Sequence, residues 1–399
     1  MFDLAFGVYI HIPYCLQICR YCDFTKYRHD KIMPPAKYIE LLLYEIRTRA
    51  HDVPLKDLST IYFGGGTPSL FEPSLILSVI NELANVGFQI LKDAEVTIEI
   101  DPTTVDQTKL ETYLKMGVTR FSVGAQTFNA RLLELAGRKH KPNDTEVLLE
   151  LLNKNRVNYS FDLLFGLPSQ TLSDVADDVA KALSYQPPHL SAYCLTVPET
   201  HPMAQGRAPD DEQVEMITLI ESELEKVGVL RYEISNYARP GFESVHNLLY
   251  WTDQAYWGLG VASHSYFPSS RRWGLRFWNA PSINLYEKDM RAWSQNSVFT
   301  FQSNLPANSH ETLELHQSLT DFCHISLRLE AGLNENAARL KFPRSAFAEV
   351  ETRLAELSNE GLVYSIANGW SLTPRGRALS NLVFERLTFL KKDLPGTTN

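Results

Sequence analysis

The chain has 399 residues, of which 44% are hydrophobic and 21% are charged, and its formal net charge at pH 7 is −9. A chain of this length exceeds what one hydrophobic core usually supports, so we expect two domains. The acidic balance argues against a broad nucleic-acid-binding surface, and no stretch of the sequence is apolar for long enough to cross a bilayer.

Residues 1–7 lack the basic region that opens a signal peptide, and five cysteines, three of them close together, do not suggest a disulfide framework. We therefore expect a cytoplasmic protein. Cys194 and Cys323 are expected to be small core residues.

A short loop after the first predicted strand holds Cys15, Cys19 and Cys22. Thiolates at this C-x3-C-x2-C spacing can bind three corners of a 4Fe–4S cluster and leave the fourth iron open to a substrate. The alternatives are a zinc site with His11 or His29 as an additional ligand, a redox dithiol, or three thiols that are close by chance. The lack of a second ligand pair and the polar character of the loop favour the cluster.

Short β-rich segments alternate with helical patterns along the chain. Strands are expected at residues 8–12, 60–63, 95–100, 120–123, 158–163 and 189–195, with helices between them. Repeated units of this kind predict an α/β fold, a parallel sheet with outer helices that forms a partial TIM-like barrel of the (βα)6 type. In such a barrel the chemistry gathers at the carboxyl ends of the strands.

Two features at these strand ends suggest ligand binding. Residues 64–66 are glycines, which let a ligand approach the backbone closely. A plain tight turn and a phosphate loop are the alternatives, although Pro68 stands where a phosphate loop carries lysine. Alternation places Glu99 inside the barrel, where a carboxylate needs a cationic or hydrogen-bonding partner. Asp162 stands likewise among apolar residues of a later strand.

Seven further motifs follow one another in order. They are YIHIP at residues 9–13, FGGGTPSL at 63–70, IEIDP at 98–102, VGAQTF at 123–128, GRKH at 137–140, DLLFGLPSQT at 162–171 and YEISNYA at 232–238. With the cysteine loop, they resemble the radical S-adenosylmethionine (SAM) superfamily. More narrowly, they are similar to the branch that contains oxygen-independent coproporphyrinogen III oxidase and the heme chaperone HemW.

The resemblance implies a 4Fe–4S cluster held by Cys15, Cys19 and Cys22, with SAM bound at the open iron. The residues that the resemblance places next to SAM or the cluster are Tyr9, Gly65, Gly66, Thr67, Glu99, Gln126, Arg138 and Asp162. The positively charged groups of SAM would supply the cationic partner that the Glu99 carboxylate needs. An electron from the reduced cluster would cleave the sulfonium to a deoxyadenosyl radical, which the barrel must shield from water.

Residues 246–251 read HNLLYW, a string associated with heme in the chaperone subgroup. The resemblance implies that His246 is an axial ligand of the heme iron, beside aromatic side chains that suit a flat macrocycle. The alternative is a histidine that only hydrogen-bonds at a domain junction. Two differences from the oxidases favour the chaperone: the first strand begins close to Met1, and Phe24 stands where the oxidases carry a further cysteine. Asp101 and Pro198 depart from the subgroup's usual residues.

The resemblance therefore implies a heme chaperone that delivers heme to recipient proteins, respiratory proteins among them, and that needs an electron donor. We expect no nucleic-acid partner, no transmembrane segment and at most a peripheral membrane contact. The alternative is an enzyme, an oxygen-independent coproporphyrinogen III oxidase that decarboxylates porphyrinogen propionates. His264 matches a family position without an assigned role.

The expected domains are a core barrel at residues 1–240, a connecting segment with the HNLLYW string at 241–302, and a C-terminal domain at 303–399. In the last, a helix near 347–357, two strands at 361–365 and 370–374 and a final helix suggest a winged-helix-like α+β domain. Its expected role is that of a lid or a partner-docking surface.

Overall fold

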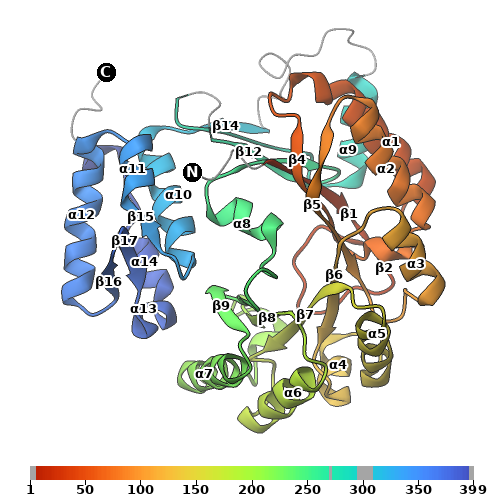
Figure 1. Ribbon diagram of the computed structural model, residues 1–399, viewed down its shortest axis with the longest axis horizontal. Coiled ribbons are helices and arrows are strands. Elements are labelled where there is room, and N and C mark those ends of the chain that lie inside the picture. The colour runs from red at the N-terminus through yellow and green to blue at the C-terminus, as the bar shows by residue number, and fades with distance from the viewer. Residues whose placement is uncertain (1–5, 269–271, 294–308, 395–399) are drawn as a thin grey trace.

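The computed structural model describes residues 6–268, 272–293 and 309–394, and a large mixed sheet dominates it (Figure 1). Six strands form its centre: β1 (Phe6–Ile12), β4 (Asp57–Gly65), β5 (Gln89–Ile100), β6 (Arg120–Gln126), β7 (Asn158–Phe165) and β8 (His189–Cys194). They are parallel and lie side by side in chain order, as the sequence predicts. The α/β class and the partial (βα)6 barrel are therefore confirmed.

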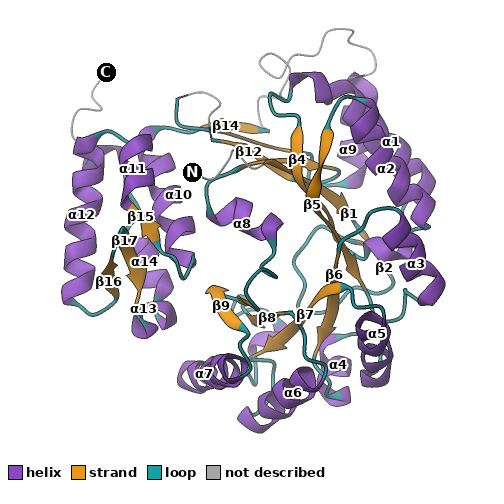
Figure 2. Cartoon of the chain, viewed as in Figure 1, coloured by secondary structure: helices purple, strands orange, loops and turns teal. Residues whose placement is uncertain are grey.

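Helices cover the outer face of these strands (Figure 2). They are α1 (Pro35–Arg49), α2 (Pro73–Asn85), α3 (Gln107–Lys115), α4 (Ala130–Ala136), α5 (Pro142–Lys154), α6 (Leu172–Ser184) and α7 (Asp210–Lys226). Local signals begin several of them: the Asp106 side chain accepts a hydrogen bond from Lys109 N at the start of α3, and Thr171 caps α6 in the same way. Gly117, with φ of 90°, reverses the chain after α3.

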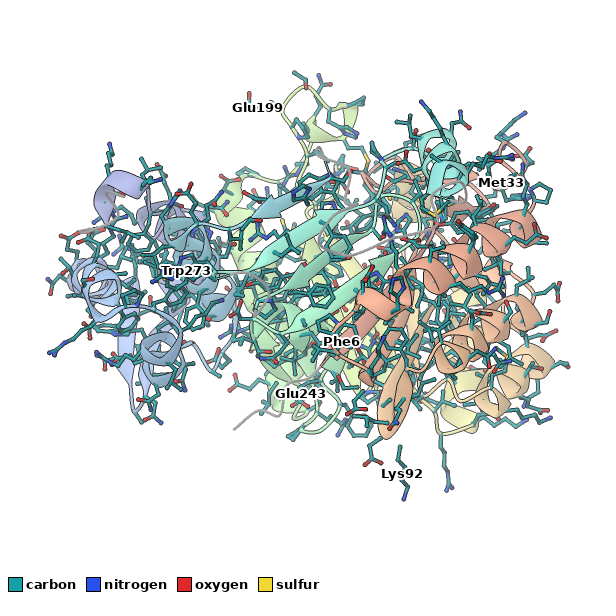
Figure 3. The ribbon with its side chains drawn as sticks, turned by 90° about the horizontal axis from the view of Figure 1, so that it is seen from above. Phe6, Met33, Lys92, Glu199, Glu243 and Trp273 are labelled. Atoms are coloured by element: carbon teal, nitrogen blue, oxygen red, sulfur yellow. The ribbon has the colours of Figure 1, made fainter. Side chains whose placement is uncertain are left out.

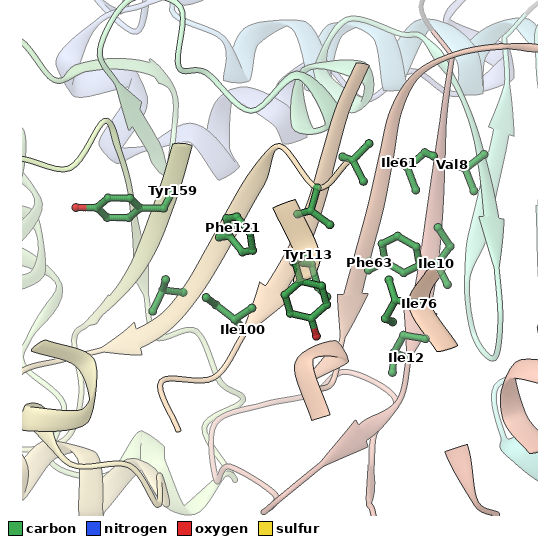
Figure 4. Close-up of a cluster of buried hydrophobic side chains, with 14 of the residues drawn as sticks. Val8, Ile10, Ile12, Ile61, Phe63, Ile76, Ile100, Tyr113, Phe121 and Tyr159 are labelled. Atoms are coloured by element: carbon green, nitrogen blue, oxygen red, sulfur yellow. The ribbon is translucent and has the colours of Figure 1, made fainter. Parts of the chain in front are cut away.

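The main core lies between the parallel strands and this helical layer. Figure 4 shows Ile10, Ile61 and Phe63 from β1 and β4 near Ile76 of α2, all of them fully buried. The alternate residues of the strands point to the other side of the sheet, into the barrel. The same period-2 pattern thus builds the core on one face and a lining for a cavity on the other.

Further strands extend the sheet at both edges. They are β9 (Leu230–Glu233), β10 (Asn236–Ala238), β11 (Ala255–Leu259), β12 (His264–Phe267), β13 (Leu275–Trp278) and β14 (His310–Thr312). The sheet runs β14-β13-β12-β11-β1-β4-β5-β6-β7-β8-β10-β9, so it is an open, curved barrel. Because β11 pairs in parallel with β1, the strands β11, β12 and β13 belong to the main sheet. The predicted boundary at residue 303 lies outside the described residues.

The C-terminal part packs as a second unit with its own core. Its elements are α10 (Leu315–Arg328), β15 (Leu333–Asn334), α11 (Glu335–Lys341), α12 (Arg344–Asn359), β16 (Val363–Ile366), β17 (Gly369–Leu372), α13 (Pro374–Ala378) and α14 (Ser380–Arg386). The predicted hairpin is confirmed, because β16 and β17 pair antiparallel. Figure 3 shows Trp273 between the large sheet and this unit, where its ring stacks on Phe342 at a centroid distance of 6.1 Å.

The remaining elements lie around the cysteine loop and the domain junction. They are β2 (Tyr14–Cys15), β3 (Tyr27–Arg28), α8 (Val245–Trp251) and α9 (Ile283–Trp293). Within the described ranges, no helix has both the length and the apolar character that crossing a bilayer requires.

Candidate functional site

A cavity of about 460 Å³ opens at the carboxyl ends of β4 to β8. It brings together ten of the twelve residues that the sequence predicts for the site: Cys15, Cys19, Cys22, Gly65, Gly66, Thr67, Glu99, Gln126, Arg138 and Asp162. Tyr9 and His246 are not among its lining residues.

The cysteine loop is tied to the barrel through its backbone. Gly66 N donates to Ile12 O (2.9 Å) and Thr67 N donates to Tyr14 O (2.7 Å), which fixes the start of the loop against the glycine turn. On the other side, Arg20 N donates to Ala136 O (3.0 Å). The loop is therefore held over the mouth of the cavity.

The three thiols face one cavity without converging on a single point. Among the described residues, no three His, Cys, Asp or Glu side chains form a ligand set for one metal ion. In a 4Fe–4S cluster each thiolate binds a different iron, so its ligands do not need to meet around one atom. Burial raises the pKa of Cys15 to about 12 and also raises that of Cys22. Coordination to a metal removes such protons.

The glycine turn is required by its close approach to residues 11–14, to the His11 ring at Gly65 and to the backbone at Gly66. Gly65 has φ of 110°, and a Cβ there would lie 2.4 Å from the His11 ring. A Cβ on Gly66 would lie 2.6 Å from Tyr14 O. Larger side chains would push the turn away from the cysteine loop, so these glycines bring the loop and the barrel together.

Two partly buried carboxylates face the cavity, as the alternation of β5 and β7 predicts. Glu99 accepts hydrogen bonds from Tyr62 Oη (2.9 Å) and Gly65 N (3.0 Å). Burial raises the pKa of Glu99 to about 7 and that of Asp162 to about 6. Both groups would be stabilised as anions by a cationic ligand.

Arg138 and Gln126 complete the rim of the cavity. The Arg138 guanidinium donates to Asp101 Oδ2 (2.8 Å) and to Gly124 O (2.8 Å), and it lies 3.6 Å from Cys19 Sγ. Gln126 has φ of 68°, which is uncommon for a residue with a side chain and is often found at functional sites.

Tyr9 and His246 lie behind the cavity wall. The Tyr9 ring stacks on His246 at a centroid distance of 6.3 Å, and its hydroxyl bonds to His11 Nδ1 (3.0 Å). His246 is 1% exposed, with Nδ1 bonded to Thr60 Oγ1 (2.7 Å) and Nε2 bonded to Tyr250 Oη (2.9 Å). Burial lowers the pKa of His246 to about 3, so its ring is neutral.

The cavity also has polar lining residues that were not predicted from the sequence. They include Tyr62, Arg120, Ser122, Ser160, Ser191, Tyr193 and Asn247, and also Cys194, which was expected in the core but lines the cavity. The alternation of strand residues could have predicted most of them, because they occupy inward positions of β4 and β6 to β8, like the predicted residues. Asn247 follows His246 in the HNLLYW string.

The sequence pattern of the radical SAM superfamily matches residues 9–182 of the chain. The fold and the cysteine-lined cavity are in accord with that class. The chain is also 33% identical to the heme chaperone HemW of Bacillus subtilis (strain 168), over 95% of this chain and 98% of that protein. With the HemW of Mycobacterium tuberculosis (strain CDC 1551 / Oshkosh) it shares 30% identity, over 96% of this chain and 94% of the other. The protein belongs to the HemW family of radical SAM proteins.

A solved structure shows the same fold over nearly the whole chain. Coproporphyrinogen III oxidase (HemN) from Escherichia coli, described as a radical SAM enzyme, aligns with a TM-score of 0.80 and 22% sequence identity. The alignment covers 97% of this chain and 90% of the oxidase. This likeness extends to the C-terminal unit as well as the barrel.

Proposed function

We propose that the protein is a heme chaperone that binds a 4Fe–4S cluster, SAM and heme, and that delivers heme to recipient proteins. The similarity to heme chaperones over the full length of the chain carries this proposal. The cavity supports it, since it joins three cysteines to residues that match the SAM contacts of the superfamily.

In this proposal Cys15, Cys19 and Cys22 hold the cluster, and the bound cluster and SAM supply one-electron reductive chemistry. Glu99 and Asp162 bind the cationic groups of SAM. Residues Gly65 to Thr67 line its methionyl end, while Gln126 and Arg138 orient it from the opposite rim. The walls of the barrel exclude water from this chemistry.

His246 is the proposed axial ligand of heme, as the HNLLYW string implies. In the structure both of its ring nitrogens are engaged, so a heme iron must displace Thr60 or Tyr250 to bind there. Tyr250 belongs to the same string and lies on α8 with His246. A shift of this short helix would release the imidazole.

The second candidate function is that of an oxygen-independent coproporphyrinogen III oxidase. The fold likeness to the oxidase from Escherichia coli does not distinguish the two functions, because it shows the fold alone. Phe24, which stands where the oxidases carry a further cysteine, is 64% exposed beside the cavity and cannot bind metal. We propose that the chaperone acts in the cytoplasm, with an electron donor for its cluster, and that the recipients of heme include respiratory proteins.

Anaerobic purification with quantified iron, sulfide and heme tests the proposal. We expect Cys19→Ala to lose most of the iron and sulfide and to keep the fold, because a cubane cluster needs all three thiolates. Cys323→Ala, in the C-terminal core, is the matched control and should keep the metal. Zinc in place of iron, or iron that persists in Cys19→Ala, would refute the cluster. Turnover of coproporphyrinogen by the wild-type protein would favour the oxidase instead.

A further inference from the structure

The inner end of the cavity contains a buried guanidinium whose Nε donor has no hydrogen-bond partner among the residues that the structure describes. Arg120 of β6 lines the cavity, and its side chain is 3% exposed. Among the described residues its nearest carboxylate is that of Glu95, with 3.9 Å between Arg120 Nε and Oε2. This distance is too long for a hydrogen bond, and Arg120 Nε has no partner within the described part of the chain.

The carboxylate of Glu95 already accepts hydrogen bonds from another element, α8. Its two carboxylate oxygens accept the backbone N–H groups of Val245 and His246, each at 3.0 Å, at the start of α8. The carboxylate therefore balances part of the Arg120 charge, but it does not satisfy the donors of the guanidinium, of which there are five.

The sheet register shows how deep Arg120 lies. Its neighbours across the sheet are Thr97 and Asn158, whereas Ser122 pairs with Glu99 and Ser160. Arg120 is thus one inward position, or about 6.6 Å, further from the carboxyl edge of the sheet than Glu99. A group that reaches Arg120 must pass the level of the predicted SAM contacts.

The surroundings of Arg120 are polar and incompletely hydrogen-bonded. Thr97 Oγ1 and Asn158 Oδ1, on either side of it, are buried without partners in the described structure. The hydroxyls of Ser122 and Ser160 lie 3.2 Å apart, and their mutual bond uses only one of two protons. Buried polar groups are normally satisfied, so a cluster of unsatisfied ones indicates a group that enters from outside.

We propose that this inner end is a binding subsite for a carboxylate group of a small molecule, with the Arg120 guanidinium as its receptor and Ser122, Ser160 and Asn247 as further donors. The planar fork of a guanidinium matches a carboxylate. A phosphate is disfavoured, because a dianion would face Glu95, Glu99 and Asp162. The inference rests on the proposed function only for its two sources of carboxylate, which are a tetrapyrrole propionate, or the methionyl carboxylate of a SAM molecule bound one layer deeper than the contacts proposed above.

Equilibrium binding to the full-length protein distinguishes the two sources. The probes are hemin, hemin dimethyl ester (which has no free carboxylate) and SAM, tested on the wild type, Arg120→Gln and Arg131→Gln. Arg131, half exposed on α4, is the matched control. If a propionate occupies the subsite, Arg120→Gln lowers the affinity for hemin about tenfold or more and leaves the affinity for the ester unchanged. If the methionyl carboxylate occupies the subsite, Arg120→Gln lowers the affinity for SAM to a similar extent.

Two results would overturn the subsite. One is unchanged affinity for both hemin and SAM in a folded Arg120→Gln protein. The other is an equal loss for hemin and its ester with unchanged SAM binding, since that indicates a structural role. If wild-type protein binds no hemin, the chaperone function fails, while the SAM measurement still tests the subsite.

A second variant covers the case in which Arg120→Gln does not fold. Ser122→Asp would place an internal carboxylate beside Arg120, where the ion pair compensates its burial. We expect this variant to fold and to bind the carboxylate-bearing ligand at least tenfold more weakly, because the receptor is already occupied. Undiminished affinity for both hemin and SAM in Ser122→Asp would overturn the proposal.

Discussion

At the residue scale, Glu99 is an acidic side chain of the cavity lining with a shifted pKa. Among the described residues its carboxylate has no cationic partner and accepts hydrogen bonds from Tyr62 Oη and Gly65 N. Burial raises its pKa to about 7, so the folded protein retains a proton that the unfolded chain has released above pH 4.5. The free energy of unfolding therefore decreases as the pH rises from about 4.5 to about 7.

Glu99→Gln should remove this contribution. We expect the ligand-free variant to be more stable than the wild type at pH 8, by on the order of 1–3 kcal/mol, and to show a flatter stability profile between pH 4.5 and 7. Chemical denaturation at several pH values measures both effects. Glu111→Gln, on the exposed face of α3, is the control and should follow the wild-type profile. A Glu99→Gln profile parallel to that of the wild type would refute the shifted pKa.

Tyr250 occupies the nitrogen of His246 that heme iron would need in the proposed function. Its hydroxyl occupies His246 Nε2 at 2.9 Å, and Thr60 occupies the other nitrogen. Tyr250→Phe frees Nε2 and keeps the ring, so we expect heme to bind several-fold more tightly by spectroscopic titration. Tyr364→Phe, on exposed β16, should leave the affinity unchanged. Equal heme affinity in the wild type, Tyr250→Phe and His246→Ala would place the heme ligand elsewhere.

At the scale of elements, α8 connects the cavity to the C-terminal unit. This seven-residue helix contacts β1, β4 and β11 on one side and α10 on the other (Figure 1). Its amino end is held by Glu95 of β5, whose carboxylate accepts two backbone N–H groups. A helix this short depends on such tertiary contacts for its stability. The position of His246 is therefore controlled from a strand residue 151 positions away in the sequence.

Glu95→Gln should loosen α8. The amide retains one acceptor oxygen for two N–H groups, so we expect a loss of about 1–3 kcal/mol in stability. Hydrogen exchange of residues 245–251 should accelerate more than that of the central strands, and mass spectrometry can measure the difference. Exchange in α8 as slow as in the wild type would show that Glu95 does not hold the helix. Glu82→Gln, which loses an ion pair with Arg47 between α1 and α2, provides a control.

At the scale of the whole molecule, paired charges join the barrel to the C-terminal unit. Arg328 of α10 contacts Glu233 of β9 at 3.4 Å and covers the Trp251 ring with 4.4 Å to its centroid. Lys341 of α11 pairs with Asp253 at 2.5 Å, after the end of α8. Because Trp251 and Asp253 belong to or follow α8, the C-terminal unit can influence the helix that carries His246.

Arg328→Gln should weaken this junction. It leaves the fully buried Glu233 without its cation, so we expect the free energy of unfolding to fall by about 1–3 kcal/mol. This is less than for a fully buried ion pair, because Arg328 is partly exposed. Calorimetry should show a lower melting temperature or a separate transition of the C-terminal unit. Arg339→Gln, on the exposed face of α11, should cost less than about 1 kcal/mol. Equal stability of the two variants would contradict a role for the pair in joining the units.

Most of the cavity could be predicted from the sequence. The parallel (βα)6 order follows from apolar periodicities, and parallel strands present their carboxyl ends at one edge, so Glu99, Gln126 and Asp162 had to lie near the glycine turn. Arg120 could have been found by the same alternation. Its unsatisfied hydrogen bonds, however, depend on where Glu95 is held, and that is a long-range contact.

The cysteine spacing, the strand and helix periods and the order of the motifs are local properties, and from them the sequence by itself determined the barrel and the loop that faces its cavity. The tertiary structure decided which contacts join distant segments. In the folded chain both ring nitrogens of His246 form hydrogen bonds, one of them with Thr60, which is 186 residues away. Folding also places β11 beside β1 in the main sheet. No local pattern encodes such contacts, because they form only when the whole chain packs and brings polar atoms of distant segments within hydrogen-bonding distance.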